Sequence, residues 1–146
     1  MKRITLCQQA AKNFRQLVAG LDEANPMKRI DNRPGTYMAV VVEFLGKVVA
    51  DGRTYSNYSI GHYYQQEGDR MSDPDITFLA VDGCEAVYPA SFRQDGGFPI
   101  NRTYMRVNDK QQMTVPAPGS RGEAMMADAA CFCTKWFRNI KDQQGI

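Results

Sequence analysis

The residues that could do chemistry are concentrated in one stretch, residues 61–78, with the sequence GHYYQQEGDRMSDPDITF. It holds the only histidine of the chain, His62, and four acidic residues, Glu67, Asp69, Asp73 and Asp75. Imidazole and carboxylate groups are ligands of catalytic divalent metals, provided that they converge on one ion. One hypothesis is therefore a metal-dependent nuclease or hydrolase that uses His62 and nearby acids, namely Asp69, Asp73 and Asp75.

The same stretch is also typical of a β-hairpin. YSIGHYYQQ and DITFLAV are strand-like, and EGDRMSDP between them is rich in turn residues. If EGDRMSDP forms the loop, antiparallel register places His62 opposite Phe78, Tyr64 opposite Ile76 and Gln65 opposite Asp75. Because side chains alternate between faces, His62 then shares a face with apolar residues and Asp75 points to the other side. The pattern favours a hairpin over a metal site.

The first part of the chain predicts a helix followed by antiparallel strands. Thr5 and Gln8 have the spacing of a capping box, and apolar residues then recur on one helical face until about Gly20. Residues 25–35 contain two prolines and a glycine and predict a loop. Turn signals at Asp51-Gly52 and Asp82-Gly83 separate the predicted strands, which span residues 36–46, about 55–65, 75–81 and 84–92.

The end of the chain predicts the clearest helix. Residues 102–107 are interpreted as a short edge strand, and the rest of residues 94–118 as loops. Ser120 and Glu123 then form a capping box ahead of an apolar stripe from Met126 to Ile140. Together these elements predict a single α+β domain over residues 1–146: an antiparallel meander of about four to five strands with both helices packed on one face.

Composition narrows the function classes. The 146 residues suffice for one stable domain. A net charge of +2 is too small to give the whole protein a positive field that would attract nucleic acid or an anionic membrane. The N-terminus lacks the apolar core of a signal peptide, and no apolar run is long enough to span a membrane, so we expect a cytoplasmic protein. Phosphate-binding glycine loops and nucleophile elbows are absent from the sequence, and no cofactor is expected.

Two sets of residues suggest binding instead of catalysis. Tyr58, Tyr63 and Tyr64 lie in a predicted strand. Tyrosine suits a partly solvent-exposed surface, because its ring is apolar and its hydroxyl group is polar. The acids Glu67, Asp69 and Asp73 at the predicted loop could mimic phosphate charge. A further hypothesis is direct nucleic-acid binding through five basic residues, Lys28, Arg29, Arg33, Arg102 and Arg106.

Two passages of the chain resemble the paired signatures of a small bacterial and phage domain family of unknown function. The first signature is H-Y-Y-x-Q-x-G-D followed by D-P and an acidic residue, and residues 62–75 match it throughout. The second is an aromatic C-terminal helix; Phe132, Trp136, Asn139 and Ile140 match it, although the aromatic spacing is one residue longer.

The resemblance implies little about activity. Members of the family are often carried by phages, plasmids and conjugative elements, so the resemblance implies a role in the conflict between a mobile element and its host. The leading hypothesis is a non-enzymatic binding protein that modulates a host defence system by contact with a host or element-encoded protein. Its expected contact residues are Tyr58, Tyr63, Tyr64, Glu67, Asp69 and Asp73.

Overall fold

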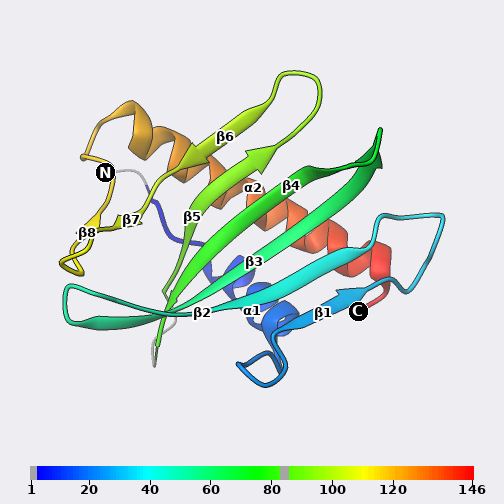
Figure 1. Ribbon diagram of the computed structural model, residues 1–146, viewed down its shortest axis with the longest axis horizontal. Coiled ribbons are helices and arrows are strands. Elements are labelled where there is room, and N and C mark those ends of the chain that lie inside the picture. The colour runs from blue at the N-terminus through cyan, green and yellow to red at the C-terminus, as the bar shows by residue number, and fades with distance from the viewer. Residues whose placement is uncertain (1–2, 83–85) are drawn as a thin grey trace.

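The computed structural model describes residues 3–82 and 86–146, which form two helices and two antiparallel sheets (Figure 1). Helix α1 (Gln8–Val18) is followed by the strands of the large sheet, and a small sheet precedes helix α2 (Arg121–Gln144). The large sheet contains β1 (Met27–Ile30), β2 (Val40–Ala50), β3 (Arg53–Gln66), β4 (Asp69–Val81), β5 (Val87–Gln94) and β6 (Ile100–Thr103). The small sheet pairs β7 (Arg106–Val107) with β8 (Met113–Thr114).

The large sheet is a pure meander, because its strands lie side by side in the order in which they occur in the chain. Both helices pack on one of its faces, where α2 crosses behind the strands (Figure 1). The core between these layers centres on three rings with centroids 5.1 to 6.4 Å apart, those of Phe14, Phe78 and Phe137. The predicted α+β class is confirmed, with slightly more strands than expected.

The ends of the two helices follow capping rules, with one difference from the sequence prediction. The N-cap of α2 is Ser120, whose Oγ accepts a hydrogen bond from the backbone N–H of Glu123 at 3.1 Å, as predicted. The N-cap of α1 is Cys7 and not Thr5: its Sγ accepts from the Ala10 N–H at 3.5 Å. Neither helix of the described residues is long and apolar enough to cross a membrane.

The prediction of a loop over residues 25–35 was wrong in part. Met27–Ile30 forms edge strand β1, with Lys28 opposite Val42 and Ile30 opposite Val40. A four-residue strand that directly follows a proline carries little signal of its own, and its pairing depends on the neighbouring strand β2.

The predicted register of the β3–β4 hairpin was also wrong. The connection is the two-residue turn Glu67-Gly68, both with positive φ, so the strands continue through most of the stretch expected to be a loop. Asp75 pairs with Gly61, and Phe78 with Tyr58, a shift of four residues from the expected pairs. Because four is even, the faces assigned to His62 and Asp75 are correct.

The far end of the meander differs from the prediction in detail. The single edge strand expected over residues 102–107 is divided between β6 and β7. Gly83 of the expected Asp82-Gly83 turn, and Cys84 at the expected start of the next strand, lie outside the described residues. The β7–β8 hairpin approaches the β2–β3 turn, where the Asp51 N–H donates to the Gln111 carbonyl at 2.8 Å.

Candidate functional site

His62 is a buried packing residue on the helix side of the sheet. Its Nδ1 donates to the carbonyl oxygen of Ala39 at 3.0 Å, and its ring packs edge-on against Trp136 with centroids 5.7 Å apart. Because a carbonyl oxygen only accepts, this bond assigns the proton to Nδ1. The structure thus uses the imidazole to join β3 to helix α2.

The acids proposed as metal ligands do not join His62. Asp75 lies on the opposite face of the sheet, Asp73 accepts a hydrogen bond from the Gln94 amide, and Asp69 is exposed at the start of β4. Among residues 3–82 and 86–146, no group of three His, Cys, Asp or Glu side chains could hold a metal ion. The geometry therefore gives the nuclease hypothesis no metal-binding cluster in the described part of the chain.

The open face of the sheet carries a compact arrangement that we call the Tyr63 stack, made of Gly61, Tyr63, Arg70 and Asp75. The Tyr63 ring lies back over Gly61, where an added Cβ would be 2.7 Å from the tyrosine hydroxyl oxygen. That hydroxyl donates to the Asp75 carboxylate, and the Arg70 guanidinium carbon lies 3.6 Å from the ring centroid. An aromatic ring over a strand glycine replaces the packing that the missing side chain would provide.

Asp75 is the electrostatically costly member of the stack. Burial raises the pKa of its carboxyl group, against the opposing effects of Tyr63 and Arg70. Its Oδ1 is buried and has no hydrogen-bond partner in the structure. Burial also raises the pKa of Tyr63, with a further contribution from the Asp75 charge. A carboxylate held in this way contributes less to stability than a solvated one would.

Acidic residues accumulate around the β3–β4 turn, in a region that we call the acidic arm. It comprises Glu43, Glu67, Asp69, Asp73, Asp75 and Asp95, brought together by the pairing of β2, β3, β4 and the end of β5. Two arginines offset part of this charge: Arg70 lies 4.0 Å from Glu43, and Arg93 lies 3.2 Å from Asp95. Within the described part of the chain, Glu67 and Asp69 are exposed and form no ion pair.

The three tyrosines expected to form one contact face are divided between the two sides of the sheet. Tyr58 packs in the core, with its ring 5.6 Å from Phe14 and 5.4 Å from Phe44 between centroids. Tyr64 alternates with Tyr63 and so lies on the helix side. Only Tyr63 of the three belongs to the open face, and there it is covered by an arginine.

The five basic residues proposed to bind nucleic acid lie at opposite edges of the fold. Lys28 and Arg29 belong to edge strand β1, and Arg33 donates to the Asp142 carbonyl at 3.2 Å. Arg102 belongs to the other edge strand, β6, and Arg106 to β7. They therefore do not form one continuous basic surface.

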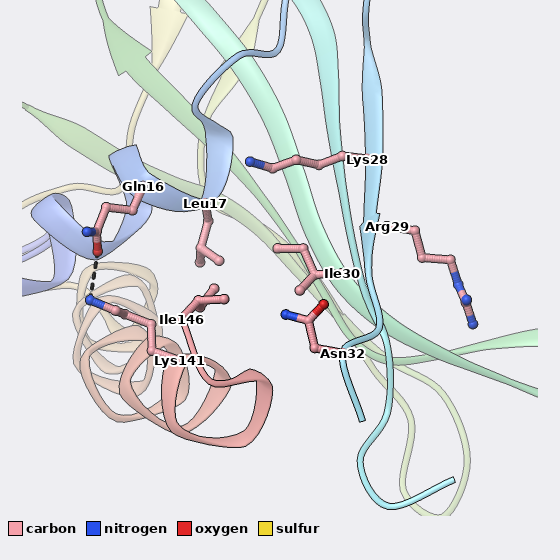
Figure 2. Close-up of a pocket in the computed structure, with 8 residues that line it drawn as sticks. All are labelled: Gln16, Leu17, Lys28, Arg29, Ile30, Asn32, Lys141 and Ile146. Atoms are coloured by element: carbon pink, nitrogen blue, oxygen red, sulfur yellow. Dashed lines mark hydrogen bonds between the residues drawn. The ribbon is translucent and has the colours of Figure 1, made fainter. Parts of the chain in front are cut away.

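One cavity brings together side chains that the sequence analysis had not connected (Figure 2). It has a volume of about 360 Å³ and lies between the end of α1, strand β1 and the end of α2. We call it the Lys28 cavity; its lining residues are Gln16, Leu17, Lys28, Arg29, Ile30, Asn32, Lys141 and Ile146. Lys141 and Ile146 lie over a hundred residues from the other lining residues in the chain, so no local motif identifies the cavity.

The chain matches one known protein family. Residues 9–146 match the family described as "Domain of unknown function (DUF6908)". The match covers nearly the whole chain, so the chain belongs to this family. No curated protein and no solved structure matches the chain.

Proposed function

We propose that this member of the family is a non-enzymatic binding protein whose acidic arm docks on a positively charged surface of a partner protein. The observation that supports the proposal best is the local charge: six carboxylates and two guanidinium groups gather at one end of a chain whose net charge is +2. Separation of charge in this way speeds association with a complementary surface and orients the partner.

The arm is built as a projecting and well-held contact element. Residues 65–70, around the turn, are all exposed, while the strands behind them pair from Gln66–Asp69 back to Tyr55–Val81 with one irregularity between Gly61 and Tyr63. The Tyr63 stack ties the two strands together on the open face, since Tyr63 comes from β3 and both Arg70 and Asp75 from β4. A preorganised arm loses little conformational entropy when it binds.

His62 and Cys133, two side chains of types that can act in catalysis, are occupied by packing. His62 joins β3 to α2, and Cys133 is fully buried in α2, where burial raises the pKa of its thiol. A buried thiol with a raised pKa is a poor nucleophile. These assignments favour binding over the hydrolase alternative.

The partner class follows from the charge of the arm. Carboxylates spaced along a hairpin present negative charge as a nucleic-acid backbone does, and the surfaces that bind nucleic acid are basic. We therefore propose that the arm occupies a nucleic-acid-binding surface, as expected of a mobile-element protein that modulates a host defence system.

A capture experiment with competition tests this proposal. The immobilised protein is expected to retain a protein from a bacterial host lysate, and added duplex DNA is expected to release it. The double variant E67Q/D69N should retain much less, because it removes the two exposed, unpaired charges of the arm.

A matched control is the double variant E23Q/D109N, which removes the same charge from exposed residues outside the arm. It should retain the partner as well as the wild type does. The proposal is wrong if nothing is retained, or if E67Q/D69N and the control behave alike.

A further inference from the structure

Strand β6 is an open edge of the large sheet. Among the described strands it pairs with β5 alone. The Tyr104 N–H donates to the Ala90 carbonyl at 2.7 Å, so by alternation the backbone groups of Arg102 also point toward β5. The N–H and C=O groups of Asn101 and Thr103 therefore face outward, where they are able to pair with another extended strand.

A groove lies beside this edge, between the sheet and helix α2. The helix side of β6 carries Ile100 and Arg102, because Arg102 lies opposite Phe92, whose ring packs edge-on against Phe132 of α2 with centroids 5.7 Å apart. Helix α2 begins beyond the free side of β6 and passes behind it (Figure 1), so a strand added to β6 would lie over the first turns of the helix. We call the cavity between them the edge groove; its walls include Phe92, Ile100, Arg102, Met125, Asp128 and Phe132.

The edge groove is small, apolar and open. Its volume of about 170 Å³ is below the range of about 300–1,000 Å³ that is usual for small-molecule sites, and it suits a single side chain. Phe132 is 41% exposed at its rim, and Phe98, in the connection that enters β6, is 97% exposed. Exposed apolar surface that continues into an apolar groove is typical of an interaction site.

Arg102 brings a positive charge without an acidic partner to the edge groove. No ion pair within residues 3–82 and 86–146 includes it or Asp128. Burial raises the pKa of Tyr104, the nearby charge of Arg102 lowers it and that of Asp128 raises it, so both charges lie near this hydroxyl group. Because Arg102 lies on β6 itself, a side chain opposite it on an added strand would have its Cβ about 4.5–5.5 Å away. An acidic residue at that position would form a cross-strand ion pair with Arg102.

Protection of the edge explains only part of this arrangement. A short edge strand and a charge that points toward the core both discourage pairing with another sheet. They do not explain the apolar groove or the exposed ring of Phe132 beside it. A second copy of the chain is disfavoured as the occupant, because the register that pairs Asn101 of each copy with Thr103 of the other sets the two copies of Arg102 directly opposite, and like charges repel there.

We propose that β6 binds an extended segment of a partner protein as a further antiparallel strand, with an acidic residue opposite Arg102 and an apolar residue, two positions later, in the edge groove opposite Ile100. The outward backbone groups of Asn101 and Thr103 bond to the residues on either side of the acidic one. The pattern that the edge recognises is therefore acidic-x-apolar. None of these residues belongs to the acidic arm, so either proposal can fail without the other.

Backbone amide chemical shifts of the whole protein, titrated with the peptide acetyl-Ser-Thr-Glu-Thr-Leu-Thr-amide, test the proposal. The amides of Asn101, Thr103 and Phe132 should shift, whereas that of Glu67 should not. Peptides with lysine in place of the glutamate, or serine in place of the leucine, should bind at least about fivefold more weakly, since each lacks one part of the recognition. A peptide N-methylated at the two threonines that flank the glutamate should not bind, because it lacks the N–H donors that face β6.

Three substitutions locate the binding. T103P removes an outward N–H and no bond to β5, a position where an edge strand tolerates proline, and it should weaken binding by about fivefold or more. R102E should bind the lysine peptide more tightly than the glutamate peptide, the reverse of the wild type. R53E is the matched control, because Arg53 is an exposed arginine at the start of β3; it should bind both peptides as the wild type does.

Folding of each variant is checked by circular dichroism, and the peptide series on the wild type replaces any variant that does not fold. The proposal is overturned if the glutamate peptide does not shift the β6 amides, or if the N-methylated peptide binds as well as its parent. It is also overturned if R102E and R53E bind the peptides alike. Sedimentation of the free protein should show a monomer; a dimer that T103P abolishes would make a second copy the occupant and would overturn the proposal as well.

Discussion

Replacing Gly61 with alanine should disrupt the Tyr63 stack without touching any other part of the open face. The new Cβ would lie 2.7 Å from the hydroxyl oxygen of Tyr63 and 2.8 Å from its Cζ, so the ring must swing away. The Gly61 backbone has no positive φ, so alanine itself is tolerated there. The substitution therefore acts through the displaced tyrosine.

The cost follows from the contacts that the displaced ring loses. A hydrogen bond to a charged group contributes about 1.5–3 kcal/mol, and an exposed cation–π contact about 0.5–1 kcal/mol. Alanine regains about 0.5–1 kcal/mol, because glycine in a strand is entropically unfavourable. The free energy of unfolding should fall by about 1–3 kcal/mol, or about 2–4 °C in Tm per kcal/mol for a domain of this size.

Urea denaturation followed by the fluorescence of the single tryptophan, Trp136, measures this loss, since that residue is buried at 6% exposure. The same substitution in a Y63A background is the control. There the clashing ring is absent, so G61A should be neutral or slightly stabilising. Equal destabilisation in both backgrounds, or none in the wild type, would refute the role assigned to Tyr63.

Three other predictions concern the stability of the fold. The first uses D75N as the reference for the wild type, in which burial raises the pKa of the Asp75 carboxyl group above its ordinary 3.8. Near that pH the native wild type therefore binds more protons than the unfolded chain, so its stability relative to D75N should fall as the pH rises above 3.8. A difference in urea midpoints that does not depend on pH would contradict this. S120A removes the N-cap bond of α2 and should cost about 1 kcal/mol by urea denaturation, whereas S120D should restore most of it. F137A empties a fully buried position between Phe14 and Phe78 and should cost about 3–5 kcal/mol in the same assay; a loss below 1 kcal/mol would mean that the three rings are not the centre of the core.

Local signals in the sequence predicted the parts of the fold that local physics determines. The capping box at Ser120 and the apolar stripe behind it correctly predicted α2, because both lie within one continuous segment. The turn at Glu67-Gly68 was missed, since glycine, aspartate, serine and proline nearby suggested a longer loop. The sheet faces predicted for His62 and Asp75 were nevertheless correct, because the missed turn shifted the strand register by an even number of residues.

The candidate sites depended on contacts that no local pattern contains. Nothing in residues 61–75 shows that Tyr63 folds back over Gly61 and under Arg70, because these contacts require the register of the finished hairpin. The Lys28 cavity needs the end of α1, strand β1 and the end of α2 to come together, and no local pattern in the sequence shows that they do. Only the acidic character of the arm was visible in advance.

The position of the arm beyond the last residues of β3 that pack on the helices has an evolutionary consequence. Substitutions at Glu67 or Asp69 change the charge that a partner meets, yet these exposed side chains make no contact on which the core depends. Gly61, a few residues away, can gain a side chain without a clash only if Tyr63 changes as well. A lineage can therefore adapt the tip to an altered partner by single steps at little cost in stability, while the base of the same hairpin stays fixed.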